Sequence, residues 1–137
     1  MDAVTCEGSV TSVGEPLSGA YWDGAGRGKL VLQRCGRCGK IRHYPRVLCD
    51  ACYSFDVEPF EAQGRGTIHS WTVTHHAFDP SMAAETPYVL ATVDLAEGVR
   101  VLGRLDEAAQ PRMGLPVRIT FRPNADGVPL IFLVPEA

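Results

Sequence analysis

Cys35-Gly-Arg-Cys38 and Cys49-Asp-Ala-Cys52, two cysteine pairs separated by ten residues, decide the fold of the first half of this chain. Two residues between paired cysteines let both thiolates of one tight turn, a knuckle, face a single ion. Two knuckles complete a tetrahedral shell of four sulfurs, the geometry of a closed structural Zn²⁺ site. Because a closed shell leaves no position for water or substrate, we expect this metal to build structure rather than to perform chemistry.

The cysteine pattern also has to be compared with redox and iron sites. Redox chemistry would need only one CxxC, placed at the start of a helix after a strand, and neither pair has that context. Iron accepts the same four-sulfur shell, so the pattern leaves zinc and iron open. Gly36 and Gly39 suit the first knuckle, where the backbone turns around a sulfur and often needs a positive φ. Cys6 stands alone in a polar stretch and is interpreted as a spare thiol.

Length and composition limit the class of protein. With 137 residues, 45% of them hydrophobic, the chain can bury one modest core beside a small appended module. No apolar run approaches the ~20 residues that span a bilayer, and no basic-then-apolar order marks a signal peptide. The cysteines therefore predict a reducing, cytoplasmic setting. A formal net charge of −3 argues against a dedicated nucleic-acid binder.

Basic residues gather around the first knuckle. Seven of the thirteen Lys and Arg residues lie in positions 27–46, where no acidic residue occurs. They form either a solvated surface that offsets the charge of four thiolates or a patch that faces an anion. The seven are Arg27, Lys29, Arg34, Arg37, Lys40, Arg42 and Arg46.

The order of segments predicts a tail and two units. Residues 1–17 are polar and without periodicity, which predicts a flexible tail. A short helix capped by Ser18 and a zinc ribbon should occupy residues 18–63, with strands at 29–34 and 42–48. Gln63-Gly-Arg-Gly66 is a turn signal, and a second unit should fill residues 64–137.

The second unit is predicted to be a five-stranded barrel of the OB type, so the fold class is mainly β. Five strand-like segments and no convincing helical period follow residue 66, while an SH3-like barrel or a sandwich fragment stays open. The last segment is apolar almost throughout and should be buried on both faces. The strands are expected at 67–76, 87–95, 99–105, 117–122 and 129–134, with Gly66, Gly98, Gly103 and Gly114 at bends or bulges.

Several short segments, taken in order, resemble the DUF35 family. They are Tyr21-Trp22, Leu30-Val-Leu-Gln-Arg-Cys35, the two knuckles, Gly64-Arg-Gly66, Thr86-Pro-Tyr-Val89 and Val93-Asp-Leu-Ala-Glu-Gly98. DUF35 proteins join a rubredoxin-like zinc ribbon to a C-terminal OB-fold, and the resemblance covers roughly residues 18–135. It implies a small companion of a thiolase-like enzyme that supports acyl-CoA binding or carbon–carbon bond cleavage and formation.

The leading hypothesis is a non-catalytic subunit of a thiolase-type acyltransferase or aldolase, working in a hetero-oligomer with no membrane contact. A CoA thioester carries phosphates and an adenine, so basic side chains beside aromatic rings suit it. The candidate residues for contact with CoA or the partner are Arg34, Arg37, Lys40, Arg42, Arg46, Tyr21 and Trp22.

Two other classes of function are alternatives to this hypothesis. Zinc ribbons and OB barrels also bind single-stranded nucleic acid, but here the barrel arginines are opposed by acidic residues. A free-standing enzyme would use His75, His76 and Asp79. Neighbouring residues of a strand point to opposite faces, so these two imidazoles should not converge.

Overall fold

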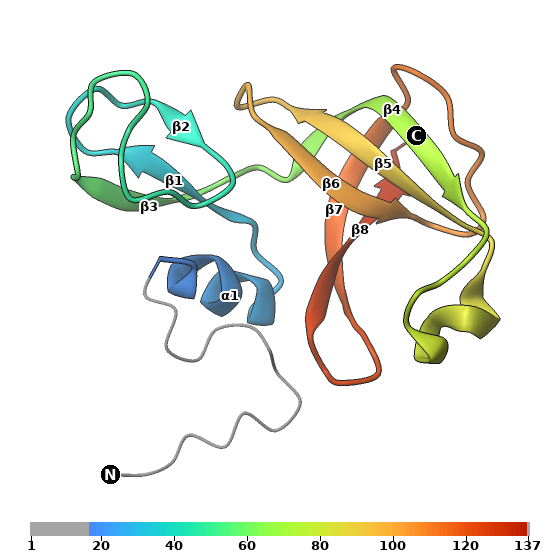
Figure 1. Ribbon diagram of the computed structural model, residues 1–137. Helices are drawn as coiled ribbons and strands as arrows, with labels where there is room; N and C mark the ends of the chain where they lie inside the picture. The colour runs from blue at the N-terminus through green and yellow to red at the C-terminus, as the bar shows by residue number, and fades with distance from the viewer. Residues whose placement is uncertain (1–16, 137) are drawn as a thin grey trace, which may run out of the picture. The chain divides into compact units, whose positions relative to one another are not determined.

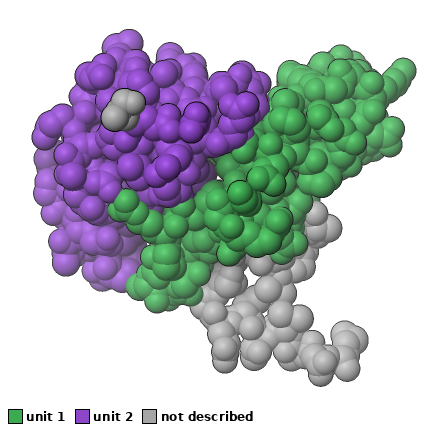
Figure 2. All heavy atoms as spheres, turned by 180° about the vertical axis from the view of Figure 1, so that it is seen from behind, with its two compact units in different colours: residues 1–62, 121–130 green, residues 63–120, 131–137 purple. Residues whose placement is uncertain are grey.

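The computed structural model describes residues 17–136, so Cys6 and all but the last residue of the predicted tail lie outside the described part. The chain forms two compact units (Figure 2). Among the described residues, one contains 17–62 and 121–130, and the other contains 63–120 and 131–136. The domain bounds at 18–63 and 64–137 stay a prediction.

The first described element is the helix α1, Gly19–Gly26 (Figure 1). Ser18 occupies the N-cap position, as predicted, but its side chain makes no capping hydrogen bond. The backbone carbonyl of Ser18 instead accepts a hydrogen bond from the Trp22 amide at 3.1 Å. Gly24 is buried, and a Cβ there would overlap Val31, which explains a glycine inside the helix.

The ribbon is a small three-stranded antiparallel sheet with the order β2-β1-β3. β1 is Val31–Cys35, β2 is Ile41–Arg42 and β3 is Val57–Glu61. The return arm predicted at 42–48 is a strand only at its start. Beyond Arg42 the chain runs irregularly to the second knuckle.

The barrel closes in the order β4-β5-β6-β8-β7 and confirms the predicted OB-type architecture. β4 is Arg65–Thr74, β5 is Tyr88–Leu95, β6 is Arg100–Leu105, β7 is Pro116–Pro123 and β8 is Pro129–Pro135. β4 pairs antiparallel with β5 and with β7, β5 pairs antiparallel with β6, and β6 runs parallel to β8. Its core holds the fully buried side chains Val93, Val101, Val117 and Leu133.

Three details of the barrel differ from the sequence-based expectation. A 3₁₀ helix, η1, forms at Pro80–Glu85, where no helix was predicted. β8 is buried on both faces only at Phe132 and Leu133 and is partly exposed elsewhere, so the predicted burial of the whole strand holds only there. The register shift of β4 lies between Ile68 and Ser70, so none of the four predicted glycines forms this bulge, whereas Gly98 and Gly114 do lie where the chain bends between strands.

Two of those glycines serve close packing instead. A Cβ at Gly66 would overlap the Asp94 carbonyl, and a Cβ at Gly103 would overlap Ile131 and touch Leu133 at about 3 Å. Gly98 and Gly114 have φ of +84° and +80°. The barrel therefore needs small residues where its strands meet most closely.

We predict that Gly103→Ala lowers the free energy of unfolding by about 1–3 kcal/mol, because the added methyl group must displace Ile131 and Leu133. Urea unfolding measures the effect. Gly19→Ala is the matched control, since a Cβ at Gly19 meets nothing within 4 Å and that site is helical. Equal midpoints for Gly103→Ala and the wild type would contradict the packing role.

No helix within residues 17–136 is both long enough and apolar enough to cross a bilayer.

Candidate functional site: a four-cysteine metal centre

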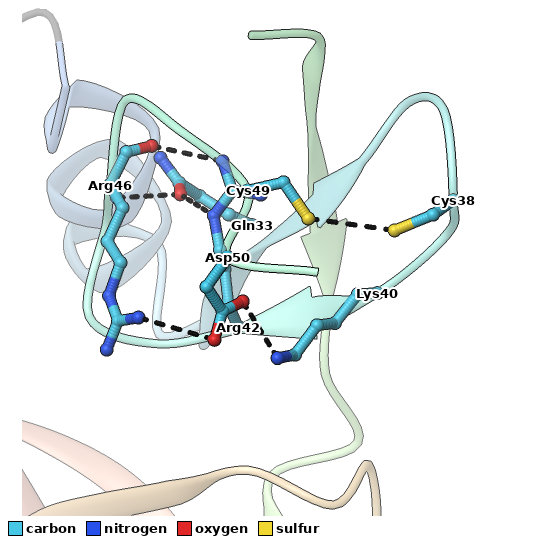
Figure 3. A network of polar contacts seen from close by, with 7 residues as sticks. All are labelled: Gln33, Cys38, Lys40, Arg42, Arg46, Cys49 and Asp50. Atoms are coloured by element: carbon cyan, nitrogen blue, oxygen red, sulfur yellow. Dashed lines mark hydrogen bonds and ion pairs between the residues drawn. The ribbon is translucent and has the colours of Figure 1, made fainter. Parts of the chain in front are cut away.

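The structure brings the four predicted metal ligands together. The Sγ atoms of Cys35, Cys38, Cys49 and Cys52 all lie within 4.8 Å of one another. Cys35 Sγ is 3.6 Å from Cys52 Sγ, and Cys38 Sγ is 3.6 Å from Cys49 Sγ (Figure 3). A tetrahedral Zn²⁺ with bonds of about 2.3 Å places its sulfurs about 3.8 Å apart, so this sulfur shell fits the ion.

The two knuckles use the same backbone turn. After the first knuckle the Gly39 amide donates to the Cys35 carbonyl at 3.0 Å, and after the second the Tyr53 amide donates to the Cys49 carbonyl at 2.9 Å. Both residues have a positive φ, +77° at Gly39 and +61° at Tyr53. Gly36 has no positive φ. Its small size instead lets the chain approach Asp56, whose Cβ would lie 3.1 Å from a Cβ at position 36.

Backbone amides prepare the sulfurs to bind a cation. The amides of Cys38 and Arg37 point at Cys35 Sγ from 3.5 and 3.4 Å and lower the pKa of that thiol to about 6. The amides of Ala51 and Cys52 likewise lower the pKa of Cys49. At Cys52 the Ser54 amide lowers the pKa, but burial and the other three cysteines outweigh it and raise the pKa to about 11. Four adjacent thiols cannot all ionise alone, and a divalent cation removes that conflict.

We predict one Zn²⁺ per chain on these four cysteines. Chelation should unfold the ribbon, because ion binding and folding are coupled in so small a module, while the strand pairing of the barrel persists. Elemental analysis and amide NMR spectra with and without chelator provide the test. Protein without metal, or a native disulfide within either pair, would contradict the prediction, and a red iron-loaded protein would identify iron instead.

The equivalence of Gly39 and Tyr53 gives a second prediction. In the left-handed region a residue with a side chain destabilises the fold by about 1–2 kcal/mol through steric strain. Glycine has no such strain, but it costs about 0.5–1 kcal/mol because its unfolded backbone has more conformational entropy to lose. Tyr53→Gly should therefore raise the stability of the zinc-bound ribbon by about 0.5–1 kcal/mol, because the side chain is 72% exposed and packs little. Gly39→Ala should lower it by about 0.5–1 kcal/mol, because the strain of alanine is partly offset by the smaller entropy of its unfolded backbone. Chemical denaturation of both variants in excess zinc measures the two changes in stability. If both variants shifted the stability in the same direction, Gly39 and Tyr53 would not occupy equivalent positions.

Most of the predicted basic patch is paired with acidic residues within the ribbon unit. Asp50 lies between Lys40, at 2.8 Å, and Arg46, at 3.8 Å (Figure 3). Arg34 donates from Nε to Glu58 at 2.6 Å and lies 5.2 Å from the centre of the Phe60 ring. These pairs are largely exposed, and such pairs stabilise a fold by only about 0–1 kcal/mol.

Arg42 differs from the other cations of the basic patch because it is buried, with only 4% of its surface exposed. Its Nε donates to Gln33 Oε1 at 2.8 Å and its Nη2 donates to the Arg46 carbonyl at 3.0 Å. Gln33 Oε1 also accepts the Arg46 amide at 2.8 Å (Figure 3). The two side chains thus hold the irregular segment before the second knuckle. Arg37 is exposed, and in the described part of the chain its side chain has no ion pair.

The two predicted aromatic residues lie partly inside the ribbon unit. The Tyr21 ring is 4.8 Å from the Trp22 ring and 5.5 Å from His43, which itself lies 4.2 Å from Tyr44. Burial, with a smaller effect of Tyr44, raises the pKa of Tyr21 to about 12. Burial lowers the pKa of His43 to about 4, so this imidazole is neutral near pH 7. These rings form a packed cluster that keeps some exposed surface.

The residues of the alternative enzyme site are not assembled for catalysis. His75 and His76 are exposed and follow the end of β4. Asp79 accepts hydrogen bonds from the Ser81 amide and hydroxyl at 2.9 and 2.8 Å, which cap η1. These bonds lower the pKa of Asp79. His76 instead packs against Phe78, with ring centres 5.5 Å apart.

Sequence reasoning missed Tyr53. The signal was present in the two knuckles themselves, which read Cys-Gly-Arg-Cys-Gly and Cys-Asp-Ala-Cys-Tyr. Placing one above the other sets Tyr53 against Gly39 and marks it as a bulky residue at a position that favours glycine.

A zinc ribbon followed by an OB barrel defines a recognised class, and family models match both parts. Residues 22–58 match the model described as "ChsH2, rubredoxin-like zinc ribbon domain". Residues 60–122 match the model described as "ChsH2, C-terminal OB-fold domain".

Similar proteins support the same assignment. A "Probable enoyl-CoA hydratase alpha subunit" of Thermomonospora curvata is 42% identical over 72% of this chain and 31% of its own length. The "Benzoylsuccinyl-CoA thiolase subunit BbsA" of Thauera aromatica is 31% identical over 72% of this chain and 69% of its own. A solved chain titled "Ltp2-ChsH2(DUF35) aldolase" is 33% identical, with a TM-score of 0.78 over 88% of this chain and 94% of that one.

The chain belongs to the DUF35 family. It spans about a third of the length of the hydratase alpha subunits it matches.

Proposed function

We propose that this protein is a non-catalytic subunit of a thiolase-type acyltransferase or aldolase complex, where it supports acyl-CoA binding and assembly of the partner enzyme. The observation that carries the proposal is the use of every cysteine between residues 17 and 136 in one closed four-sulfur centre. Thiolase chemistry needs a nucleophilic thiolate, a base and donors for the thioester oxyanion. The names of the similar proteins, a thiolase subunit and an aldolase complex, support a partner of that class.

The contribution to acyl-CoA binding would come from the ribbon cations. Arg37 is the first candidate, because it is exposed and without an ion pair in the described residues. Arg34, Lys40 and Arg46 can exchange their carboxylates for a phosphate at small cost, since exposed pairs are weak. Arg42 would act indirectly by holding Arg46, and Tyr21 and Trp22 would offer ring surface.

Binding of single-stranded nucleic acid has less support. Such a barrel should present free cations between exposed aromatic rings. Here Arg100 donates to Asp94 at 2.6 Å, and Arg104 is 8% exposed between Glu85, at 3.0 Å, and Glu107, at 3.2 Å. Arg65 also pairs with Glu136, at 3.3 Å, so at least three barrel arginines are engaged by carboxylates.

The function is tested by recovering partners of the tagged, zinc-loaded protein from its own cells and assaying the fractions with acyl-CoA thioesters. We expect a thiolase-like chain in the complex, turnover by the complex, and none by the isolated chain. Turnover by the isolated chain that disappears in His76→Ala would refute the proposal. Recovery of no thiolase-like chain would also refute it.

The contribution of Arg37 to acyl-CoA binding is measured by comparing the recovered complex with the same complex that carries Arg37→Ala. Loss of one charge-assisted contact to phosphate should weaken acyl-CoA binding about ten- to a hundredfold. Arg112→Ala should leave it unchanged, because this barrel arginine is exposed and its side chain has no partner among residues 17–136. Lost assembly in Arg37→Ala would assign this residue to the partner interface, and no change would leave it as solvated surface.

A further inference from the structure

The ribbon exposes an unusual concentration of large apolar side chains. Of the eleven exposed large hydrophobic residues in the described chain, six fall within positions 44–57. Their exposed fractions run from 39% to 72%. Single exposed apolar residues are ordinary, but a cluster marks a surface that binds something. The six are Tyr44, Val47, Leu48, Tyr53, Phe55 and Val57.

Four of the six belong to one turn of the chain, which we call the knuckle patch: Val47, Leu48, Tyr53 and Phe55. The Cys49 amide donates to the Ser54 carbonyl at 3.0 Å, and the Tyr53 amide donates to the Cys49 carbonyl at 2.9 Å. These bonds hold the backbone at Cys49 next to Tyr53 and Ser54, so the segments that enter and leave the second knuckle start from adjacent points. The metal ligands Cys49 and Cys52 fix the same turn from inside.

Tyr53 is the informative member of the knuckle patch. Its backbone has a φ of +61°, and the first knuckle fills the equivalent position with Gly39. A tyrosine at this position strains the backbone, yet its side chain is 72% exposed and gains little from packing within the chain. The benefit of this side chain therefore lies outside the chain.

Resting on the proposed function, we propose that the knuckle patch is the surface through which the protein docks on its thiolase-like partner. Aromatic side chains on a rigid support are efficient anchors of protein interfaces, because little freedom is lost when they are buried. A metal-pinned knuckle supplies that support. The partner surface should be apolar at its centre, to receive Tyr53 and Phe55.

The charges around the patch favour a protein partner over a phosphate ligand. Asp50, within the second knuckle, is shared by Lys40 and Arg46, and the exposed Asp56 follows Phe55, so the charges beside the patch sum to zero. The four apolar side chains of the patch offer no hydrogen-bond donor to a phosphate except the Tyr53 hydroxyl. A surface with an apolar centre and a polar rim of mixed charge on the partner complements this arrangement.

The test uses Tyr53→Gly and Phe55→Ser in the full zinc-loaded chain, with the thiolase-like chain recovered by the wild type as the probe. Tyr53→Gly removes the ring and relaxes the backbone, so weaker binding cannot be ascribed to misfolding. Phe78→Ser is the control, because this barrel phenylalanine is 96% exposed and lies outside the patch. Titration calorimetry should give a Kd ten- to a hundredfold weaker for each patch variant and within threefold of wild type for Phe78→Ser, with unchanged zinc content.

The outcomes separate this inference from the proposed function. If the wild type recovers no thiolase-like chain, the proposed function fails. If the wild type binds and both patch variants bind equally well, the docking surface is wrong while the function stands. Weakening by Phe78→Ser alone would move the interface to the barrel. Self-association of the wild type that is lost in Tyr53→Gly would make a second copy the occupant, and it too would overturn the inference.

Discussion

The coordination of one ion by four sulfurs is the constraint on which the ribbon depends. Its sheet has strands of five, two and five residues, and sheets this small are marginal in water without another stabilising element. The four sulfurs link the first knuckle, which follows β1, to the second knuckle, and no strand pairing joins these two knuckles to each other. Amides aimed at Cys35 and Cys49 favour their thiolates before any ion is bound. The ion therefore completes a shell that the backbone has largely shaped.

Charge in this ribbon is organised by pairs that are distant in sequence. Arg34 meets Glu58 across 24 positions, and Lys40 meets Asp50 across ten. A count of charges along residues 27–46 finds only cations, because their acidic partners lie within or after the second knuckle. The folded surface is consequently far less basic than the linear sequence suggests. Arg42 shows the extreme case, since it is buried and acts on the backbone of its own unit.

The elements that the sequence predicted well have strong local signals. The spacing of the cysteines led directly to the metal centre, and β-branched runs between turn residues located all five barrel strands to within a few positions. The failures came from tertiary context. The partial exposure of β8 depends on what covers it, and η1 depends on Asp79 and Pro80 in a short loop without hydrophobic periodicity. The exposure of Tyr53 and Phe55 could not be read from hydrophobicity, which normally predicts burial.

The strand edges have a consequence for how the protein can associate. In the barrel, β4 pairs with β7 only over Arg65–Thr67, so the part of β4 beyond Ile68 has no strand partner on that side. In the ribbon, the edge strands are β2 and β3. β2 is two residues long, and β3 carries two glutamates and Pro59, which lacks an amide hydrogen. Both ribbon edges are therefore poor templates for an added strand, and contacts of the described ribbon with other proteins are expected to be made by side chains.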